Sequence, residues 1–576
     1  MRKLLVYLKD YKKESLLAPL FKMLEASFEL FVPLVMASII DVGIANGDRT
    51  HIMKMCGMLI LLAVIGLTCS ITAQYFSAKA AVGFAAKVRH ALFSHIQSLS
   101  YSEMDEIGTS TMITRMTSDI NQVQTGVNMV LRLFLRSPFI VFGAMIMAFT
   151  IDVKAALIFV VTIPLLAIVV FGIMLVSIPL YKKVQGGLDD VLLTTRENLT
   201  GSRVIRAFHK EKEETEKFRE KNQTLTALQM FVGRISALMN PVTYIIINVA
   251  IVVLIWTGAL RVESGNITQG EVVALVNYMS QILVELVKLA NLIITITKSV
   301  ACGNRIESIM EIHSTMNEGS GVTSSEEKSE DYAVVFENVA MRYQSGGAPA
   351  VSGIDFKVRH GETVGIIGGT GSGKSTIINL IPRFYDTSEG RVLVDGQDVR
   401  EYTFEGLRDK IGIVPQKAVL FAGTIRDNMK WGKQDATDEE IWEAMTLAQA
   451  SEFVEQKDGR LDAEVEQGGR NFSGGQKQRL TIARALVKQP EILILDDSAS
   501  ALDYATDAKL RQSIRSMKSD PTVFIVSQRA ASILHADQIV VLDDGAVAGI
   551  GTHESLLRDC EVYQEIYYSQ FQKKEA

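Results

Sequence analysis

Thr363-Val-Gly-Ile-Ile-Gly-Gly-Thr-Gly-Ser-Gly-Lys-Ser375 is the stretch that decides the fold of the second half of this chain. The apolar run that ends at Ile367 predicts a buried strand, and a helix is predicted to follow the glycines. Glycines placed in this way let backbone N–H groups surround phosphate oxygens at the positive N-terminus of a helix. The pattern G-x4-G-K-[ST] therefore predicts a nucleotide-phosphate site, with Lys374 on the β- and γ-phosphates and Ser375 on Mg²⁺. Its expected members are Gly368, Gly369, Thr370, Gly371, Ser372, Gly373, Lys374, Ser375 and Thr376.

Short β-branched runs alternate with helical segments from Ala333 onward. The runs are Val364–Ile367, Ile411–Val414, Ile492–Leu495, Val523–Val526 and Ile539–Leu542. This alternation predicts an α/β domain with a largely parallel central sheet. The third run ends in Asp496, and a carboxylate at the end of a buried strand can hold Mg²⁺ against the phosphates of a nucleotide. We therefore expect ATP and Mg²⁺ as the ligands of this domain.

The first half of the chain is dominated by six apolar stretches, each long enough to cross a bilayer as a helix. They are residues 17–42, 57–78, 129–150, 155–179, 237–260 and 271–297. The chain is 48% hydrophobic and 22% charged, so the two characters must be segregated along it. We expect an all-α six-helix transmembrane domain over residues 1–312, a polar Gly/Ser-rich linker over 313–332 and a P-loop ATPase domain of the α/β class over 333–576.

Lys and Arg gather at the N-terminus and in the two long segments between spans, residues 79–128 and 180–236. By the positive-inside rule, both termini, both long segments and the ATPase domain are expected in the cytoplasm, with the spans in the cell membrane of a bacterium. The long segments contain few helix breakers. We interpret them as two cytoplasmic extensions, in which membrane helices continue beyond the bilayer and turn back through a short connector. Two small cytoplasmic domains are the alternative.

Composition excludes some other classes of protein. The four cysteines include no CxxC pair, so their spacing excludes a zinc ribbon or a disulfide scaffold. The net charge of −6 argues against a nucleic-acid partner.

Phe472-Ser-Gly-Gly-Gln476, which precedes a basic helix, is similar to the signature motif of ABC transporters. The rest of residues 333–576 matches that family in order, and six spans followed by one ATP-binding cassette resemble the half-transporter layout of its multidrug-type exporters. In such proteins two cassettes close head to tail around two ATP molecules. The resemblance implies nucleotide contacts for Tyr343 (on adenine), Ser473, Gly474, Gly475, Gln476 and Asp503, and a Mg²⁺-sensing role for Gln416.

Two residues depart from the pattern of that family. Asp497 stands where a Glu is expected to activate the attacking water, and Gln528 stands where a His is expected to contact the γ-phosphate. Losing a general base costs about 10²- to 10⁴-fold in rate. Since the signature motif is intact and serves the opposite site, we expect a heterodimer in which a partner half-transporter carries Glu and His. A homodimer with two slow sites is the alternative.

Charged and polar residues also interrupt the spans. Such residues are costly in a bilayer and usually face a bundle interior or a wet cavity. In the sixth span, the spacing from Asn277 to Lys288 places the polar residues on one face of a helix. We hypothesise that an inward-open substrate cavity is lined by Asn277, Gln281, Glu285, Lys288, Glu25, Glu29, Arg132 and Arg136, with ion pairs between helices. Structural pairs unrelated to substrate are the alternative.

Together these observations predict ATP-driven export of small hydrophobic or amphipathic compounds by one half of a heterodimeric transporter. A homodimeric exporter of lipid or peptide, or an ATP-gated regulator, remains the alternative.

Overall fold

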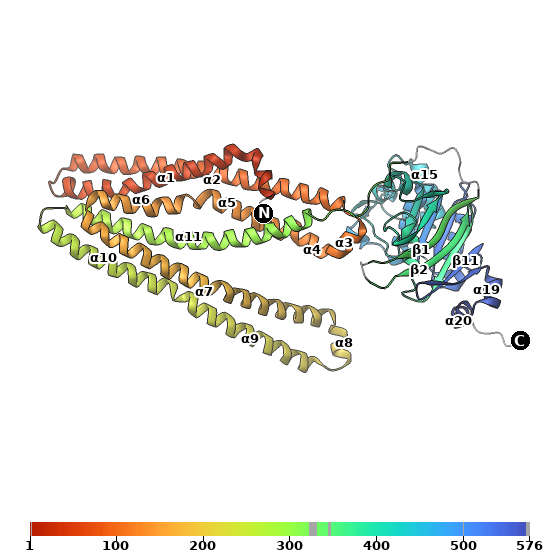
Figure 1. The fold of residues 1–576 in the computed structure, drawn as a ribbon. Coiled ribbons are helices and arrows are strands. Elements are labelled where there is room, and N and C mark those ends of the chain that lie inside the picture. Colours follow the sequence, from red (N-terminus) through yellow and green to blue (C-terminus); the bar gives the residue numbers. More distant parts are fainter. Residues whose placement is uncertain (2, 322–330, 344–346, 499, 572–576) are drawn as a thin grey trace. The chain divides into compact units, whose positions relative to one another are not determined.

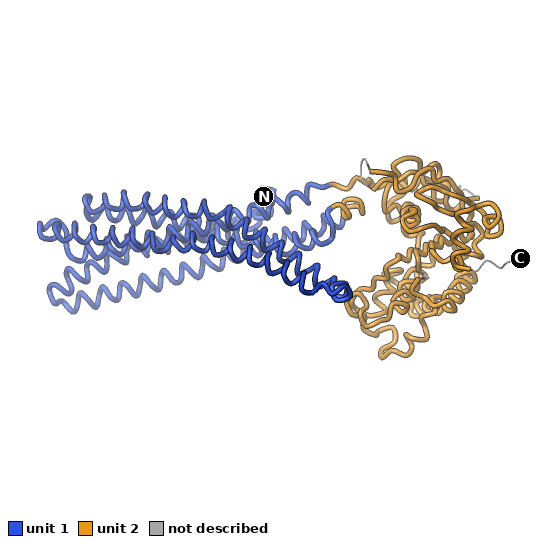
Figure 2. The backbone as a smooth tube through the Cα atoms, turned by 90° about the horizontal axis from the view of Figure 1, so that it is seen from below, with its two compact units in different colours: residues 1–98, 107–312 blue, residues 99–106, 313–576 orange. Residues whose placement is uncertain are grey.

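The computed structural model describes residues 1, 3–321, 331–343, 347–498 and 500–571. Part of the expected linker, residues 322–330, lies outside the described residues. The chain divides into two compact units (Figure 2). The first holds residues 1–98 and 107–312, and the second holds residues 99–106 and 313–576.

The described residues of the first unit form helices and no strands (Figure 1). Six of its helical segments are long and apolar enough to cross a membrane, which confirms the six-span prediction. These segments are Leu4–Ile44, Arg49–Gln97, Thr109–Ile151, Val153–Thr200, Glu211–Glu263 and Gln269–Met310. Their main helices are α1 (Lys12–Ser38), α2 (Arg49–Gln97), α5 (Ile120–Leu133), α6 (Arg136–Ile151), α7 (Val153–Thr200), α9 (Glu211–Ala237), α10 (Met239–Glu263) and α11 (Gln269–Met310).

The helices continue well beyond the length needed for a bilayer. Helix α2 has 49 residues and α7 has 48, whereas about 20 residues span the hydrocarbon core. A short helix follows each of them before the chain turns back. It is α3 (Tyr101–Ile107) after α2 and α8 (Ser202–Ala207) after α7. The apolar stretch at 129–150 is interrupted by a two-residue turn at Phe134 and Leu135, which separates α5 from α6.

Helix α11 packs tightly against α1. The buried hydroxyl of Tyr278 donates a hydrogen bond of 2.6 Å to the Leu30 carbonyl oxygen. At the beginning of α11, the Asp41 carboxylate accepts hydrogen bonds from the Thr268 hydroxyl and the Gly270 amide. A Cβ atom on Gly270 would collide with the Ala37 carbonyl oxygen. Glycine is therefore required for this close approach of two helices.

The second unit contains a mixed six-stranded sheet in the order β12-β11-β3-β10-β9-β6. Its strands are β3 (Thr363–Gly368), β6 (Ile411–Val414), β9 (Ile492–Asp496), β10 (Thr522–Val526), β11 (Gln538–Asp543) and β12 (Ala546–Gly551). Every pairing is parallel except that of β11 with β12. This confirms the predicted α/β class with a largely parallel sheet.

A second, antiparallel sheet has the order β2-β1-β4-β5. Its strands are β1 (Tyr332–Met341), β2 (Val351–Arg359), β4 (Glu389–Val394) and β5 (Gln397–Asp398). Apolar residues of β1, β2 and β4 share one core with residues of β3, β9 and β10. Another core gathers around helix α17 (Gly474–Val487) and the C-terminal helix α20 (Glu561–Gln570).

The contact at Gly270 yields a stability prediction. Gly270→Ala forces α1 and α11 apart, and overpacking of this kind costs about 1–3 kcal/mol. Gly172→Ala is the matched control, because a Cβ there meets nothing within 4 Å and alanine favours a helix by roughly 0.5–1 kcal/mol. We expect the thermal unfolding midpoint of the purified protein to fall for Gly270→Ala and to stay level or rise for Gly172→Ala. Equal shifts would contradict the packing argument.

Candidate functional site

The glycine-rich loop follows β3 directly and leads into α12 (Lys374–Leu380). Gly371 and Gly373 have φ values of +86° and +90°, a conformation that glycine adopts without a steric penalty. The buried ammonium group of Lys374 donates to the carbonyl oxygens of Gly368 at 3.0 Å and Gly369 at 2.5 Å. Burial lowers the pKa of Lys374, although the carboxylates of Asp497 and Asp496 oppose this effect. The loop is thus a cradle of backbone N–H groups with a positive charge beside it.

Ser375 and Asp496 come together as expected for a Mg²⁺ site. The Ser375 hydroxyl lies 3.1 Å from Asp496 Oδ2 and 3.3 Å from Oδ1. Burial raises the pKa of Asp496, while the hydrogen bond from Ser375 acts in the opposite direction. A buried carboxylate and a hydroxyl beside a phosphate cradle suit Mg²⁺, which usually takes one or two protein oxygens and completes its shell with phosphates and water. The residues therefore fit ATP with Mg²⁺.

One cavity of about 350 Å³ collects most of the residues that the motifs predict. It is lined by Tyr343, Ala350, Thr370, Gly371, Gly373, Lys374, Ser375, Thr376, Gln416, Asp496, Asp497, Val526 and Gln528. Gly368, Gly369 and Ser372 belong to the loop and contact the Lys374 ammonium group through their oxygens. Strand order explains the convergence, because the parallel strands β3, β6, β9 and β10 all direct their carboxyl ends to this edge of the sheet.

Both departures from the family pattern lie in this cavity. Asp497 follows β9 with a φ of +45°, and its amide donates to the Val526 carbonyl oxygen at 2.9 Å. Asp tolerates this left-handed conformation better than most residues. Gln528 is exposed just beyond β10. An acidic group and an amide thus stand at the two positions where Glu and His are expected.

The signature segment lies apart from the phosphate cavity. Ser473 caps α17 in a reciprocal arrangement, in which its hydroxyl accepts from the Gln476 amide and the Gln476 side chain accepts from the Ser473 amide. Ser473 and Gly474 are exposed, and none of Ser473 to Gln476 is among the described residues that line the cavity. Asp503 caps the next helix, α18 (Tyr504–Arg515), and accepts from both the amide and the hydroxyl of Thr506.

The structure adds two residues that motif analysis missed, Tyr385 and Asp105. The ring of Tyr343 packs edge-on against Tyr385, with ring centroids 5.1 Å apart. The Tyr385 hydroxyl donates a hydrogen bond of 2.6 Å to the Asp105 carboxylate in α3. Burial and, to a smaller extent, this hydrogen bond raise the pKa of Tyr385. The Tyr343 hydroxyl lies 3.0 Å from that of Thr376. A chain of contacts therefore runs from Thr376, at the beginning of α12, through two tyrosines to Asp105 in α3. No short motif marks it, because its members are far apart in sequence.

Another cavity, of about 430 Å³, lies in the membrane unit between α1, α6 and α11. It is lined by Glu29, Val32, Pro33, Met36, Ile140, Asn277, Ser280, Gln281, Val284, Glu285 and Lys288. All four polar residues predicted on one face of the sixth span are present in this lining. The side-chain oxygen of Gln281 is buried without a hydrogen-bond partner among the described residues.

A network of charges forms one wall of this cavity. The guanidinium of Arg136 contacts Glu285 and Glu29, each at 2.7 Å. Glu285 is buried and also accepts from Ser137 and Lys288, each at 2.8 Å. These contacts satisfy several of the polar groups, as a buried ion pair requires.

Three of the eight residues proposed for the cavity are not in its lining. Arg136 is outside the lining but pairs with two residues that belong to it, Glu29 and Glu285. Glu25 pairs with Lys22 at 2.6 Å instead of with an arginine. Arg132 makes no ion pair with any described residue, and its buried Nε has no acceptor there.

Comparisons with known proteins agree with this geometry. The family description "ABC transporter transmembrane region" matches residues 15–286, and "ABC transporter" matches residues 351–500. An uncharacterised ABC transporter ATP-binding protein of Mycobacterium tuberculosis is 36% identical over 574 residues, covering 98% of this chain and 97% of that protein. A putative multidrug export ATP-binding/permease protein of Bacillus subtilis is 33% identical over 578 residues, covering 98% of each.

The fold is also that of a solved protein. A bacterial Atm1-family ABC exporter superposes with a TM-score of 0.79 at 23% identity, covering 98% of this chain and 99% of that one. The chain belongs to the ABC transporter family. It is a half-transporter of the exporter type, with six membrane helices and one ATP-binding cassette, whose ATPase activity is coupled to transport.

The charge network yields a second stability prediction. Glu285→Gln leaves Lys288 unpaired and Arg136 with Glu29 alone, and breaking a buried pair costs about 3–5 kcal/mol. Glu29→Gln is the matched control, because its side chain is 41% exposed and such pairs are worth about 0–1 kcal/mol. We expect a clearly larger fall in unfolding midpoint for Glu285→Gln. Equal effects would show that the network does not depend on Glu285.

Proposed function

We propose that this chain is one half of a heterodimeric exporter of hydrophobic or amphipathic compounds. Its own phosphate loop binds ATP and hydrolyses it slowly, and its signature segment completes the active site of its partner. The spans lie in the cell membrane, with both termini and the cassette in the cytoplasm. The observation that carries the proposal is the combination of Asp497 and Gln528 in the phosphate cavity with an intact, exposed signature at Ser473–Gln476.

The division of labour follows from where these groups lie. Hydrolysis at the cavity needs a group that activates water, and the carboxylate of Asp497 is one methylene shorter than that of Glu. A misplacement of about 1 Å can cost roughly 100-fold in rate. Gln528 can donate a hydrogen bond but has no titratable proton. The signature segment depends on neither residue, because it is preformed by its own helix cap.

The proposed substrates follow from the membrane cavity. Its walls combine apolar residues such as Val32 and Met36 with the polar residues Asn277 and Gln281. A cavity that mixes apolar side chains with polar and charged ones suits an amphipathic molecule. The name of the Bacillus subtilis relative, a putative multidrug export protein, points in the same direction.

Restoring the longer carboxylate tests the slow-site proposal. Asp497→Glu should raise the rate of ATP hydrolysis at this site by about 10-fold or more, since the longer side chain brings the carboxylate within reach of the attacking water. Asp544→Glu is a matched control, because Asp544 also has a positive φ (+43°) but lies in the turn after β11. The measurement is single-site ATPase of the purified full-length chain, alone and with any half-transporter that co-purifies. Brisk hydrolysis by an unmodified dimer of this chain alone would contradict the heterodimer.

The substrate proposal is tested in the cavity. Asn277→Ala removes a polar group from its lining and should shift the concentration of amphipathic compound that half-maximally stimulates ATPase by about 3- to 10-fold. Asn248→Ala is the control, because Asn248 is an exposed residue of α10 outside this lining. Transport into inverted vesicles is measured in parallel. An unchanged profile for both variants would place the substrate elsewhere, and lipid transfer without drug transport would favour a lipid exporter.

A further inference from the structure

The segment that carries Gln528 connects β10 to the short 3-10 turn Ala530–Ser532. Three sets of contacts fix the backbone of this segment. In the first set, the Arg529 guanidinium donates to the carbonyl oxygens of Ser500 at 3.3 Å and Leu502 at 3.4 Å, and it lies over the ring of Tyr504. These contacts connect the segment to the loop between β9 and α18.

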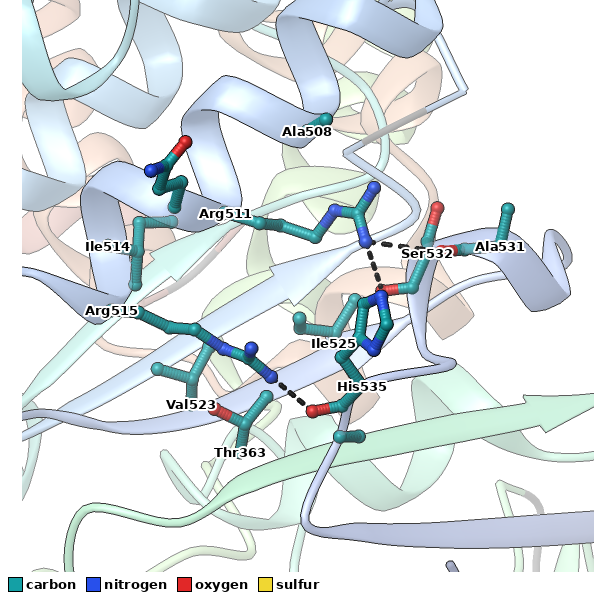
Figure 3. Close-up of a pocket in the computed structure, with 12 residues that line it drawn as sticks. Thr363, Ala508, Arg511, Ile514, Arg515, Val523, Ile525, Ala531, Ser532 and His535 are labelled. Carbon is teal, nitrogen blue, oxygen red and sulfur yellow. Dashed lines mark hydrogen bonds between the residues drawn. The ribbon is translucent and has the colours of Figure 1, made fainter. Parts of the chain in front are cut away.

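The second set of contacts comes from α18. One nitrogen of Arg511 donates to the carbonyl oxygens of Ala531 at 3.1 Å and Ser532 at 3.4 Å (Figure 3). The Asp507 carboxylate pairs with Arg511 at 2.9 Å and accepts from the Ser532 hydroxyl at 3.3 Å. These contacts fix the far end of the segment, beyond Gln528.

The third set comes from the C-terminal helix α20, through Gln570. The side-chain amide nitrogen of Gln570 donates to the Gln528 carbonyl oxygen at 2.7 Å. Its oxygen accepts from the Ala530 amide at 2.9 Å. The Gln570 side chain therefore forms hydrogen bonds with the backbone on both sides of Arg529. One of these two bonds is to Gln528, which lines the phosphate cavity.

Helix α20 is itself firmly anchored. Tyr563 is fully buried, and its hydroxyl lies 2.8 Å from His553 Nδ1 in α19 (His553–Asp559). Val562, Ile566 and Tyr567 pack against the core around α17. Gln570 consequently extends from a fixed base, and its two hydrogen bonds can orient the Gln528 peptide.

We propose that Gln570 is a positioning residue for the ATPase reaction, and that α20 uses it to hold Gln528 in its place at the phosphate cavity. Water can replace the hydrogen bond to the Gln528 carbonyl oxygen, because Gln570 and Gln528 are exposed, whereas the amide of the fully buried Ala530 loses its acceptor. Loss of the Gln570 amide removes no apolar core contact, and it frees the Gln528 peptide to turn away. The role requires only the ATPase activity of the family, and it holds for a homodimer as well as for a heterodimer.

Gln570→Met tests the proposal, since it keeps the length of the side chain and removes both hydrogen bonds. We expect kcat for ATP to fall by about 3- to 10-fold, with KM little changed and only a small fall in the unfolding midpoint from the unpaired Ala530 amide. KM is preserved because Tyr343 and the phosphate loop, which line the nucleotide cavity, are untouched. Rates are normalised to bound nucleotide, so that a loss of folded protein does not imitate the effect. Gln564→Met is the matched control, because Gln564 lies on the same helix and its amide donates to Arg558 instead.

A coupling measurement separates positioning from a merely structural role. Gln528→His is introduced with and without Gln570→Met, and the fold-gain in kcat is compared. If Gln570 acts through residue 528, the gain is smaller by about 3- to 10-fold in the Gln570→Met background. Equal gains in the two backgrounds, or an equal loss of activity in Gln564→Met, would overturn the proposal.

Discussion

The parallel register of β3, β10 and β9 is the constraint on which the nucleotide site depends. Val526 pairs with both Ile366 and Asp496, so β10 and β9 end at one level and β3 ends two residues beyond it. The segments that follow them, which carry the phosphate loop, Asp497 and Gln528, must therefore meet at one edge. No single contact assembles the site. The backbone ladder of the sheet does so, and the buried apolar side chains on both faces hold that ladder in place.

A different constraint acts on the membrane unit, because charged side chains inside an apolar helix bundle must be paired. Arg136 is shared between Glu285 and Glu29, and Glu285 is also bonded by Ser137 and Lys288. This sharing leaves the neighbouring Asn277 and Gln281 free to line the cavity. The polar residues of the sixth span thus serve two purposes, since some stabilise the bundle and others face the open space.

Contacts around the phosphate cavity connect it to α3 and to the C-terminal helix α20. Tyr343 and Tyr385 lead to Asp105 in α3, and Gln570 belongs to α20. These contacts reach different residues of the nucleotide site, because Tyr343 contacts Thr376 in α12 and Gln528 follows β10. The cavity is therefore framed by elements that have no part in binding phosphate.

The sequence by itself determined the class of each half, because spans and phosphate loops are local patterns whose meaning depends on the spacing of a few neighbours. It also identified Asp497 and Gln528, since a departure is visible once the surrounding motif is known. Only the tertiary structure decided that Glu25 pairs with Lys22, that Arg136 joins two glutamates, and that Gln570 reaches Gln528. The physical reason is that these partners, apart from Lys22 and Glu25, are distant in the chain and follow no periodicity, so packing alone chooses among the available charges and amides.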